Sequence, residues 1–369
     1  MQDANLIIVN TCTVTHVADA KTRKTVRSVC KKNTLDTSKI IVTGCAAAIY
    51  SDFYVAIDSR IQFVSKLSMI GTLAGLIGEV STSAQANILA GENFRTRASI
   101  KVQDGCDNAC TYCIVHVARG KSTSVPASDV VAQAKALLNA GVKEINLTGV
   151  NIGAYCDGDI NLAKLLNELV TLIEHKFANY SGIPARFRLG SIEPQDFSDK
   201  LIEVIAAAQG KICRHFHLPL QSGSSKVLGQ MNRRYTADAF LQLVHKIKEA
   251  MPTASFSTDV ICGFPGETDD DFSQTLEVCK QCRFMKIHVF PYSMRKNTPA
   301  AQRDDQIDPK IKNARCKQLQ ELGRALAKQD LEKRKGEFGL IEAPNRARLE
   351  SYHLIKCDSI EIGSLVKFS

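Results

Sequence analysis

The chain has 369 residues, of which 44% are hydrophobic and 23% charged, a balance typical of a folded protein with about two or three domains. No apolar run reaches the roughly 18–20 residues that cross a bilayer, and the first residues lack the basic segment of a signal peptide, so we expect a cytoplasmic protein. The net charge of +9 favours an anionic partner, with nucleic acid as the first candidate.

The first part of the chain has the pattern of an α/β domain. Residues 5–9 and 40–42 are short apolar runs typical of buried parallel strands, and residues 16–32 between them predict a helix. Residues 21–32 of this helix carry several Lys and Arg and no acid, which fits either a solvated helix face or a contact with RNA. Residues 81–97 are small and polar and predict a linker.

From residue 98 strands and helices alternate regularly. The predicted strands are residues 99–102, 144–147, 186–189, 215–218, 255–261 and 286–290. The predicted helices between them include residues 127–139, 163–174, 237–250 and 270–280. Because βα units in series form a parallel sheet with right-handed crossovers, we expect a partial or full barrel. Residues 308–335 predict a charged amphipathic helix, and strands near residues 353–355 and 364–368 predict a small C-terminal β module.

The strongest chemical signal is a C-x3-C-x2-C cluster directly after the first predicted barrel strand, made by Cys106, Cys110 and Cys113. Three thiolates suit a 4Fe–4S cluster with one open iron that can bind a substrate, and active sites of parallel barrels lie at the carboxyl ends of strands. A zinc site with His116 as a fourth ligand and unrelated core cysteines are the alternatives. Five further cysteines are predicted to pack as small hydrophobic residues: Cys156, Cys213, Cys262, Cys316 and Cys357. Cys279 and Cys282 form a C-x2-C pair on a predicted helix, and because a thioredoxin-like motif needs a different context we expect them to be helix-face residues.

The other predicted barrel strands also end in segments that mix glycine or proline with polar side chains. These segments are residues 147–151, 190–194, 219–223, 263–268 and 291–295. One such segment would be an ordinary loop. Their common position around one barrel mouth favours a binding site.

These segments resemble the radical S-adenosylmethionine (SAM) methylthiotransferases. The cysteine loop has the C-x3-C-x-Y-C signature, and TGVNIG, SIEP, HLPLQSGS, MNRRYT, DVICGFPGET and FPYSMRKNTPA extend the likeness over almost the whole chain. Residues 10–19, NTCTVTHVAD, are similar to the branch that modifies N6-threonylcarbamoyladenosine in tRNA. The resemblance implies an incomplete flavodoxin-like N-terminal domain at residues 1–85, a radical SAM partial (β/α)6 barrel at 94–330, and a TRAM-like small β-barrel that binds RNA at 331–369.

The resemblance also implies roles for particular residues. Cys106, Cys110 and Cys113 would hold the 4Fe–4S cluster, whose open iron binds SAM and whose electron cleaves it. The residues implied to lie around SAM are Tyr112, Thr148, Gly149, Asn151, Ser191, Glu193, Ile261 and Gly263. Roles in or around the substrate site are suggested for Gln221, Ser222, Arg233, Tyr292 and Arg295.

The family carries a second 4Fe–4S cluster on three cysteines of the N-terminal domain, which takes part in sulfur insertion. Cys12 and Cys45 each follow a predicted strand and would lie at one sheet edge; otherwise they would be small core residues. The family's first cysteine lies upstream of the strand that precedes Cys12. We therefore expect an N-terminally truncated chain in which the second cluster lacks its third ligand, with Cys30 as a weak substitute.

The resemblance predicts an enzyme that replaces the C2 hydrogen of threonylcarbamoyladenosine at position 37 of tRNA with a methylthio group. Its partners would be the tRNA anticodon stem-loop, a flavodoxin- or ferredoxin-type electron donor and a sulfur source. The alternatives are isopentenyladenosine or a ribosomal protein as substrate, and a SAM-cleaving or tRNA-binding remnant without methylthiolation. Residues 331–369 hold seven basic and six acidic residues, so RNA binding by this module is implied by the resemblance and not by charge.

Overall fold

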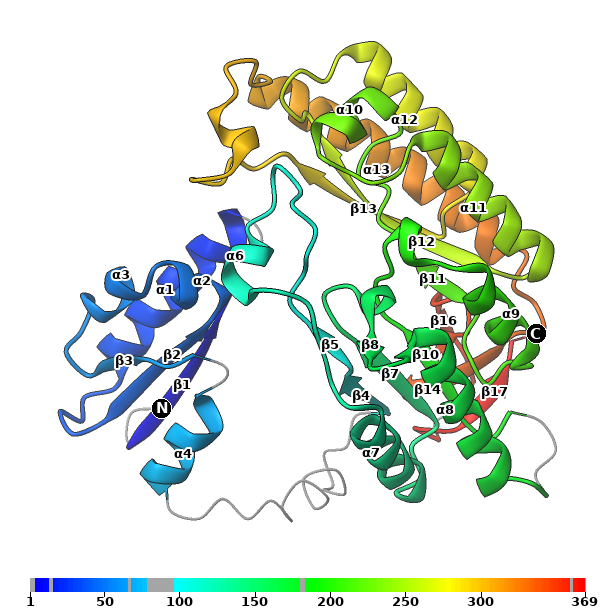
Figure 1. Cartoon of the computed structure of the whole chain (residues 1–369), viewed down its shortest axis with the longest axis horizontal. Helices are drawn as coiled ribbons and strands as arrows, with labels where there is room; N and C mark the ends of the chain where they lie inside the picture. Colours follow the sequence, from blue (N-terminus) through cyan, green and yellow to red (C-terminus); the bar gives the residue numbers. More distant parts are fainter. Residues whose placement is uncertain are drawn as a thin grey trace. The chain divides into compact units, whose positions relative to one another are not determined.

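The computed structural model describes residues 4–12, 16–65, 68–77, 96–179, 183–358 and 361–368 (Figure 1). Its contacts divide the chain into two compact units. The first unit comprises residues 1–88, 107–109 and 113–121, and the second comprises residues 89–106, 110–112 and 122–369. Most of the predicted linker at residues 81–97 lies outside the described residues, and Arg97 already begins a strand.

The N-terminal unit is built on a parallel sheet. In its described part the strand order is β1 (Leu6–Thr11), β2 (Lys39–Gly44) and β3 (Ile61–Phe63). The helices are α1 (His16–Lys32), α2 (Cys45–Ile49), α3 (Ser51–Val55), α4 (Met69–Ile77) and, from the later segment, α6 (Val115–Arg119). Ile40, Ile41 and Val42 are all fully buried, so β2 is covered on both faces, as a central parallel strand requires. The strands and helix predicted here are confirmed.

The second unit contains parallel strands that follow one another in chain order. They are β4 (Arg97–Lys101), β7 (Glu144–Thr148), β10 (Arg186–Leu189), β11 (His215–His217), β12 (Ser255–Cys262) and β13 (Lys286–Pro291). Strands β4, β7 and β10 hydrogen-bond as one sheet and β11, β12 and β13 as another. Parallel bridges from Phe187 to Ile212 and from Ser191 to His217 join the two. The six predicted barrel strands are thus confirmed to within about two residues at each end.

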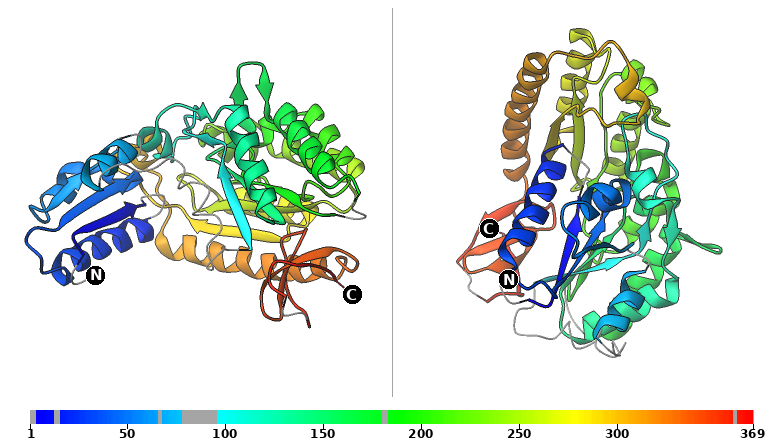
Figure 2. Two further views of the ribbon diagram at one scale, coloured as in Figure 1. Left: turned by 90° about the horizontal axis from the view of Figure 1, so that it is seen from below. Right: turned by 90° about the vertical axis from the view of Figure 1, so that its left-hand side faces the viewer.

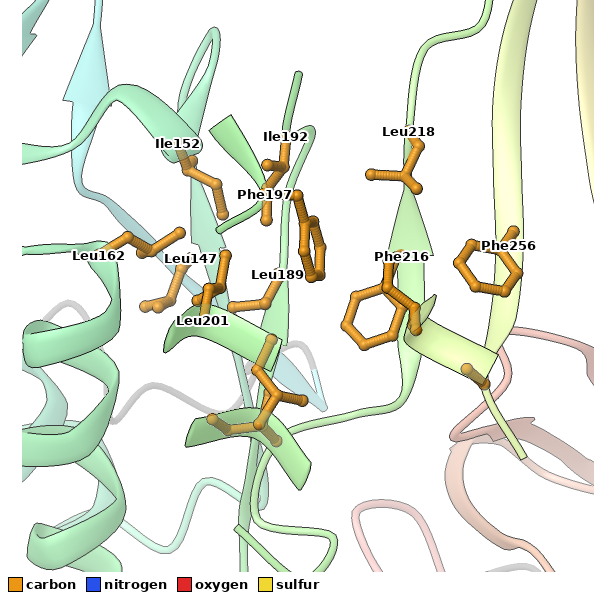
Figure 3. Close-up of a cluster of buried hydrophobic side chains, with 14 of the residues drawn as sticks. Leu147, Ile152, Leu162, Leu189, Ile192, Phe197, Leu201, Phe216, Leu218 and Phe256 are labelled. Atoms are coloured by element: carbon orange, nitrogen blue, oxygen red, sulfur yellow. The ribbon is translucent and has the colours of Figure 1, made fainter. Parts of the chain in front are cut away.

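Helices between these strands supply an apolar outer layer. They are α7 (Ala127–Asn139), α8 (Leu162–Lys176), α9 (Asp199–Ala207), α10 (Ser225–Gln230), α11 (Ala237–Ala250) and α12 (Asp269–Cys282), while α13 (Pro309–Leu331) lies along β13 (Figure 2). Leu147, Leu189 and Phe216 of the strands share one buried cluster with Leu162 and Leu201 of the helices (Figure 3). Burial of each such side chain contributes about 1.5–3 kcal/mol, so this layer fixes the positions of the strands.

The cysteines predicted to pack in the core largely do so. Cys213, Cys262 and Cys316 are buried, and Cys357 is partly buried. Cys279 and Cys282, expected on a helix face, lie on α12 and are buried. The prediction was wrong for Cys156, whose side chain is exposed. This residue lies in a short antiparallel pair, β8 (Cys156–Asp157) with β9 (Ile160–Asn161), which has no apolar face to cover it.

The inner face of the same sheet is polar. Along the strands, polar side chains that point inward alternate with apolar side chains that point outward. The inward polar positions are Glu144, Asn146 and Thr148 on β7, Arg188 on β10, His215 and His217 on β11, Ser257 on β12 and His288 on β13. Residues from β7 through β13 line one pocket, so the sheet must curve around a shared interior. The sheet therefore has a separate inside, which an open flat sheet would lack.

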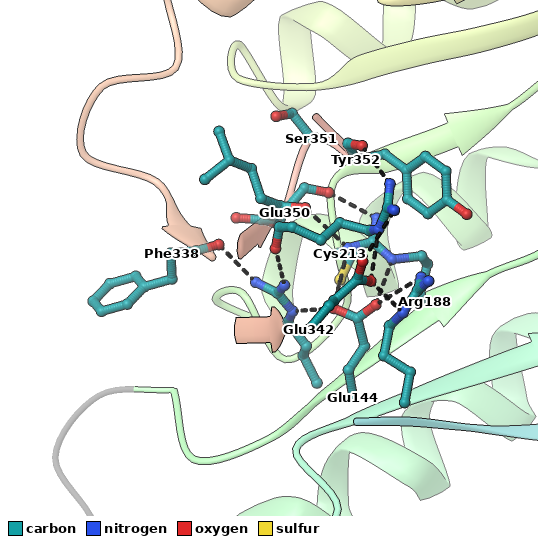
Figure 4. A network of polar contacts seen from close by, with 12 residues as sticks. Glu144, Arg188, Cys213, Phe338, Glu342, Glu350, Ser351 and Tyr352 are labelled. Atoms are coloured by element: carbon teal, nitrogen blue, oxygen red, sulfur yellow. Dashed lines mark hydrogen bonds and ion pairs between the residues drawn. The ribbon is translucent and has the colours of Figure 1, made fainter. Parts of the chain in front are cut away.

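The C-terminal residues form an antiparallel sheet with the order β16 (Leu354–Lys356), β15 (Arg346–Leu349), β14 (Phe338–Ala343) and β17 (Leu365–Lys367). A buried ion-pair network fastens this sheet to the barrel (Figure 4). The Glu144 carboxylate accepts hydrogen bonds from Arg186 Nε at 2.7 Å and Arg188 Nε at 2.8 Å. The same guanidiniums donate to backbone carbonyls of the sheet, among them those of Phe338 at 3.0 Å and Glu350 at 2.8 Å.

The charge of this network is fixed by the two arginines. Burial alone would raise the pKa of Glu144, but the guanidiniums of Arg188 and Arg186 outweigh it and hold that pKa below its ordinary value. The carboxylate therefore stays ionised beneath the barrel.

Among the helices that the structure describes, none has the length and apolar character of a membrane span.

Candidate functional site

The three clustered cysteines lie in the loop between β5 (Gln103–Asp104) and α6, after the carboxyl end of β4. None of them forms a disulfide. The Sγ of buried Cys110 accepts a hydrogen bond from Arg233 Nη1 at 3.2 Å, and the Sγ of Cys113 accepts one from the backbone N–H of Val115 at 3.4 Å. Hydrogen bonds to the ligand sulfurs are a common feature of iron–sulfur sites. The donor set of this loop therefore fits a 4Fe–4S cluster.

Arg233 links this loop to the barrel. Its side chain is only 4% exposed and forms an ion pair with Glu193, and its Nη1 also lies 3.5 Å from the hydroxyl of Tyr112. Burial raises the pKa of Glu193 although Arg233 opposes that shift. The sequence suggested a substrate role for Arg233 and a SAM role for Glu193; the structure brings both residues into one buried contact beside Cys110.

Gln103 is a site residue that the sequence analysis missed. It is fully buried, and its Oε1 accepts hydrogen bonds from the backbone N–H groups of Val150 and Asn151, each at 2.9 Å. Its Nε2 donates to the carbonyl of Gly105 at 2.8 Å. A Cβ at Gly149 would come 2.9 Å from the same Oε1, so a glycine is needed there. Gln103 thus holds the start of the cysteine loop against the loop after β7.

Asn151 performs a similar task for the loops after β7 and β10. Its Nδ2 donates to Asp196 Oδ2 at 2.5 Å, and its Oδ1 accepts from the backbone N–H of Glu193 at 3.1 Å. Since both ends of its amide are engaged, we interpret Asn151 as a positioning residue. Thr148 and Ser191, at the ends of the same two strands, line the inner pocket of the barrel.

An aromatic cluster gathers on the other side of the cysteine loop. The ring of Tyr112 meets that of Phe264 edge-on at 6.4 Å, and Tyr292 meets Phe264 in the same way at 5.6 Å. Ile261 packs against this cluster. Phe264 and Tyr292 are buried, so the partly exposed Tyr112 and Ile261 are the apolar surface that this cluster offers, and such a surface suits a nucleobase. Gly263 follows with φ +71°, a backbone conformation that glycine adopts without strain, and its N–H donates to Glu267 Oε2 at 2.9 Å.

The remaining predicted substrate residues have structural contacts. Gln221 has φ +63°, and its backbone bonds to Asp259 at 2.8 Å and Ile261 at 2.9 Å. Ser222 is 1% exposed and lies 3.4 Å from Thr275 Oγ1. Arg295 is 6% exposed. Their roles toward a substrate stay predictions.

In the N-terminal unit, Cys12 and Cys45 follow the ends of β1 and β2. Thr11 and Gly44 are register partners, so both cysteines leave the sheet at the same edge, as the sequence predicts. Cys12 is exposed, while the Sγ of buried Cys45 accepts a hydrogen bond from Arg119 Nε at 3.3 Å. Gly44 has φ +95°, and a Cβ there would collide with the carbonyl oxygen of Thr11. The edge therefore requires a glycine directly before Cys45.

Cys30 fits a ligand role less well. It lies on α1 and packs partly against the core of this unit. Burial and the nearby Asp58 carboxylate raise the pKa of its thiol, which disfavours the thiolate.

Comparisons with known proteins first identify the class of protein to which the chain is similar. The model of the radical SAM superfamily matches residues 100–279, and that of uncharacterized protein family UPF0004 matches residues 1–65. The fold is similar to that of the radical SAM methyltransferase TsrM from Kitasatospora setae, with a TM-score of 0.56 and 15% identity over 80% of this chain and 66% of that one. It is also similar to the cobalamin-dependent SAM radical enzyme OxsB, with a TM-score of 0.55 and 11% identity over 87% and 48%. The fold is that of the radical SAM proteins.

Proteins related in sequence identify the family within this class. The chain is 39% identical to the threonylcarbamoyladenosine tRNA methylthiotransferase MtaB of Bacillus subtilis (strain 168), covering 89% of this chain and 74% of the relative. It is 36% identical to the protein of the same name from Chlamydia pneumoniae, over 90% and 76%. A tRNA-2-methylthio-N(6)-dimethylallyladenosine synthase of Alkaliphilus oremlandii is 35% identical over 86% and 69%. The chain belongs to this family of radical SAM methylthiotransferases, whose members use a 4Fe–4S cluster and SAM.

Proposed function

We propose that this enzyme inserts a methylthio group at C2 of N6-threonylcarbamoyladenosine at position 37 of tRNA, beside the anticodon. The observation that carries the proposal is the 39% identity to a relative named for this nucleoside, over most of both chains. The dimethylallyladenosine synthase at 35% identity makes that nucleoside the second candidate substrate. Because tRNA is the substrate, we place the enzyme in the cytoplasm, with a flavodoxin- or ferredoxin-type electron donor and a separate sulfur source.

Cys106, Cys110 and Cys113 are the residues that would hold the radical SAM cluster. When bound, this cluster supplies the electron that cleaves SAM and so starts removal of the C2 hydrogen. Arg233 would hold the Cys110 sulfur in place through its 3.2 Å hydrogen bond, while Gln103 and Asn151 hold the surrounding loops. Further residues that would contact SAM are Tyr112, Thr148, Gly149, Ser191, Glu193, Ile261 and Gly263.

Cys12 and Cys45 are the residues that we assign to a second 4Fe–4S cluster. Their common sheet edge and the Arg119 donor on Cys45 support this assignment. Anaerobically reconstituted protein should contain more than four and up to about eight irons per chain, because the barrel loop supplies three thiolates and the N-terminal edge two. A Cys12→Ala/Cys45→Ala variant should contain about four, since each cluster holds four. About four irons in both proteins would restrict the chain to a single cluster.

The C-terminal sheet is our candidate for a TRAM-like tRNA-binding module. Arg346 and Lys356 are exposed cross-strand neighbours on β15 and β16, and Lys367 is exposed on β17. Contacts from such side chains go to phosphates and weaken with salt. An Arg346→Ala/Lys356→Ala variant should reduce the slope of log affinity against log salt by roughly 1–2, because each lost phosphate contact removes about 0.7–0.9. An unchanged slope would move the RNA contact elsewhere.

The proposed reaction can be tested on nucleosides from cells. Deletion of the gene should remove 2-methylthio-threonylcarbamoyladenosine from digested tRNA and leave its unthiolated precursor, as measured by mass spectrometry. Reintroduction of the wild-type gene should restore the product, and the Cys106→Ala gene should not. Product that persists in the deletion strain contradicts the proposal, and loss of the dimethylallyl product instead would favour the second candidate.

A further inference from the structure

The curved sheet forms a pocket whose inner side chains, beyond the SAM residues Thr148 and Ser191 at its mouth, have no role in the function proposed above. Its volume is about 290 Å³, and side chains of β7, β10, β11, β12 and β13 line it together with Tyr352 of the C-terminal module. Thr148 and Ser191 belong to the lining at the carboxyl ends of their strands, whereas His215 lies at the start of β11. The pocket therefore extends from the barrel mouth, where the target base must approach, into the interior.

Two residues in this pocket have polar atoms without a partner. His215 is 4% exposed and stacks on the ring of Tyr352 at 4.9 Å. Within the described part of the chain neither of its ring nitrogens forms a hydrogen bond. The Oδ1 of Asn146 on β7 also lacks a hydrogen-bond partner there. Buried polar atoms rarely remain unpaired in folded proteins, so these atoms point to a polar ligand.

A second polar group lies beside them on β11, β12 and β13. The Nδ1 of His217 is 2.9 Å from Ser257 Oγ, and its Nε2 is 3.3 Å from Asp259 Oδ2. His288, the register partner of Asp259, has its ring 5.8 Å from that of His217. Of these residues, His217, Ser257 and His288 line the pocket and add hydrogen-bond donors and acceptors to it, while Asp259 contacts His217.

The charge of the pocket is nearly balanced. Burial lowers the pKa of His215, and Arg188 lowers it further; burial also lowers the pKa of His288. Both imidazoles are therefore neutral at neutral pH, and each offers one donor and one acceptor. The Arg188 guanidinium is paired with Glu144. The pocket thus suits a ligand with several hydrogen-bonding groups.

We propose that this pocket binds the polar substituent on N6 of the target adenosine and selects it by hydrogen bonds to His215, Asn146 and the His217–Asp259–His288 group. This inference rests on the proposed function. A threonylcarbamoyl group carries amide, hydroxyl and carboxylate functions that pair with such atoms. A dimethylallyl group has none and cannot pair with His215 or Asn146. Sites built from buried polar groups reject such analogues strongly.

The test compares two anticodon stem-loop RNAs of one sequence, which carry either threonylcarbamoyladenosine or dimethylallyladenosine. Their affinities for the reconstituted holoenzyme are measured by fluorescence anisotropy. The wild-type enzyme should prefer the first RNA by about tenfold or more. His215→Phe, which keeps the stack on Tyr352, and Asn146→Leu should each remove most of that preference. His288→Leu changes an exposed residue, and it replaces His215→Phe and Asn146→Leu in the test if those variants do not fold.

The matched control is His245→Phe, which makes the same change at an exposed position of α11 and should leave the preference unchanged. If the folded pocket variants keep the wild-type preference while the wild-type enzyme methylthiolates the first RNA, the inference is overturned and the proposed function stands. If the wild-type enzyme methylthiolates neither RNA, the proposed function itself fails. Stoichiometric Zn²⁺ bound by the Cys106→Ala/Cys110→Ala/Cys113→Ala variant, and lost on Asp259→Asn, would instead make the group a cation site and overturn the inference.

Discussion

The two parallel sheets of this chain position their polar groups differently. In the N-terminal sheet β2 is buried on both faces, and the chemically important side chains, Cys12 and Cys45, appear only where strands end. In the barrel sheet only the outer face is apolar, and polar side chains run along the strands on the inside. Curvature makes the difference, because it creates an interior face that helices do not cover. The curved sheet can therefore bind a ligand along its strands, whereas the buried faces of β2 leave only the sheet edge for a ligand.

The largest expected effect concerns the cysteine loop at the mouth of the curved sheet. Cys106→Ala, Cys110→Ala or Cys113→Ala should each reduce SAM cleavage to background, because the loss of one of the three thiolates removes a ligand that positions the cluster and its open iron for SAM. The 5′-deoxyadenosine formed under reducing conditions gives the readout. Cys156→Ala, which changes an exposed cysteine, is the matched control and should keep wild-type activity. Full activity in a loop variant would place the radical site elsewhere.

A substitution of Glu144 tests whether polar groups inside the barrel also stabilise the folded structure. Glu144→Gln should lower the free energy of unfolding by about 3–5 kcal/mol, because Arg186 and Arg188 would remain buried without their carboxylate. Urea unfolding monitored by circular dichroism measures this loss. A loss below about 1 kcal/mol, the value of an exposed ion pair, would contradict the network as drawn.

The same carboxyl group predicts a pH dependence. The pKa of Glu144 in the folded state is lowered, so its contribution is fully present above the unfolded pKa of about 4.3 and is lost as the pH falls toward the folded value. Wild-type stability should therefore fall more steeply than that of Glu144→Gln between about pH 5 and pH 3. Parallel curves for the two proteins would show that Glu144 is not paired in the folded state.

Arg233 tests the link between the barrel and its cysteine loop. Arg233→Met should cost roughly 3 kcal/mol of stability, because it leaves Glu193 buried and unpaired, and it should also weaken cluster retention through Cys110. Adding Glu193→Gln should restore most of the stability and little of the iron content. Complete recovery of both quantities in the double variant would show that Arg233 acts only as the partner of Glu193.

The smallest effect is expected at the edge of the N-terminal sheet. Gly44→Ala should destabilise the N-terminal unit by roughly 1–3 kcal/mol, because a side chain at φ +95° is strained and meets the Thr11 carbonyl. Iron bound through Cys12 and Cys45 should decrease, while SAM cleavage is maintained. Gly75→Ala on α4, where a Cβ meets no atom, is the control. Equal loss of SAM cleavage would contradict the separation of the two sites.

The sequence predicted most of what depends on local pattern. Barrel strands were located because short segments with alternating side chains, such as residues 186–189 (RFRL), lie between glycine- and proline-containing turns, and the cysteine loop was identified by its spacing. Contacts between distant segments could not be predicted in this way. Arg233 and Cys110 are 123 residues apart, and no local pattern joins them.

The polar inner face was missed for a related reason. Asn146 and His215 alternate with apolar neighbours, as residues on any solvated strand face do. Only the curvature produced by pairing strands far apart in the chain turns that face into an interior. Gln103 likewise acts through backbone groups of a loop 47 and 48 residues away. Cys156 was wrongly expected to be buried because its hairpin leaves the barrel without an apolar cover.

The central claim, that the barrel loop starts the radical reaction and the N-terminal edge serves sulfur insertion, can be tested in one assay. Reconstituted wild-type, Cys12→Ala/Cys45→Ala and Cys106→Ala/Cys110→Ala/Cys113→Ala enzymes are incubated with SAM, reductant and a threonylcarbamoyladenosine stem-loop. We predict 5′-deoxyadenosine and methylthiolated RNA from the wild type, 5′-deoxyadenosine alone from the double variant, and neither product from the triple variant. SAM cleavage by the triple variant, or methylthiolation by the double variant, would contradict the account.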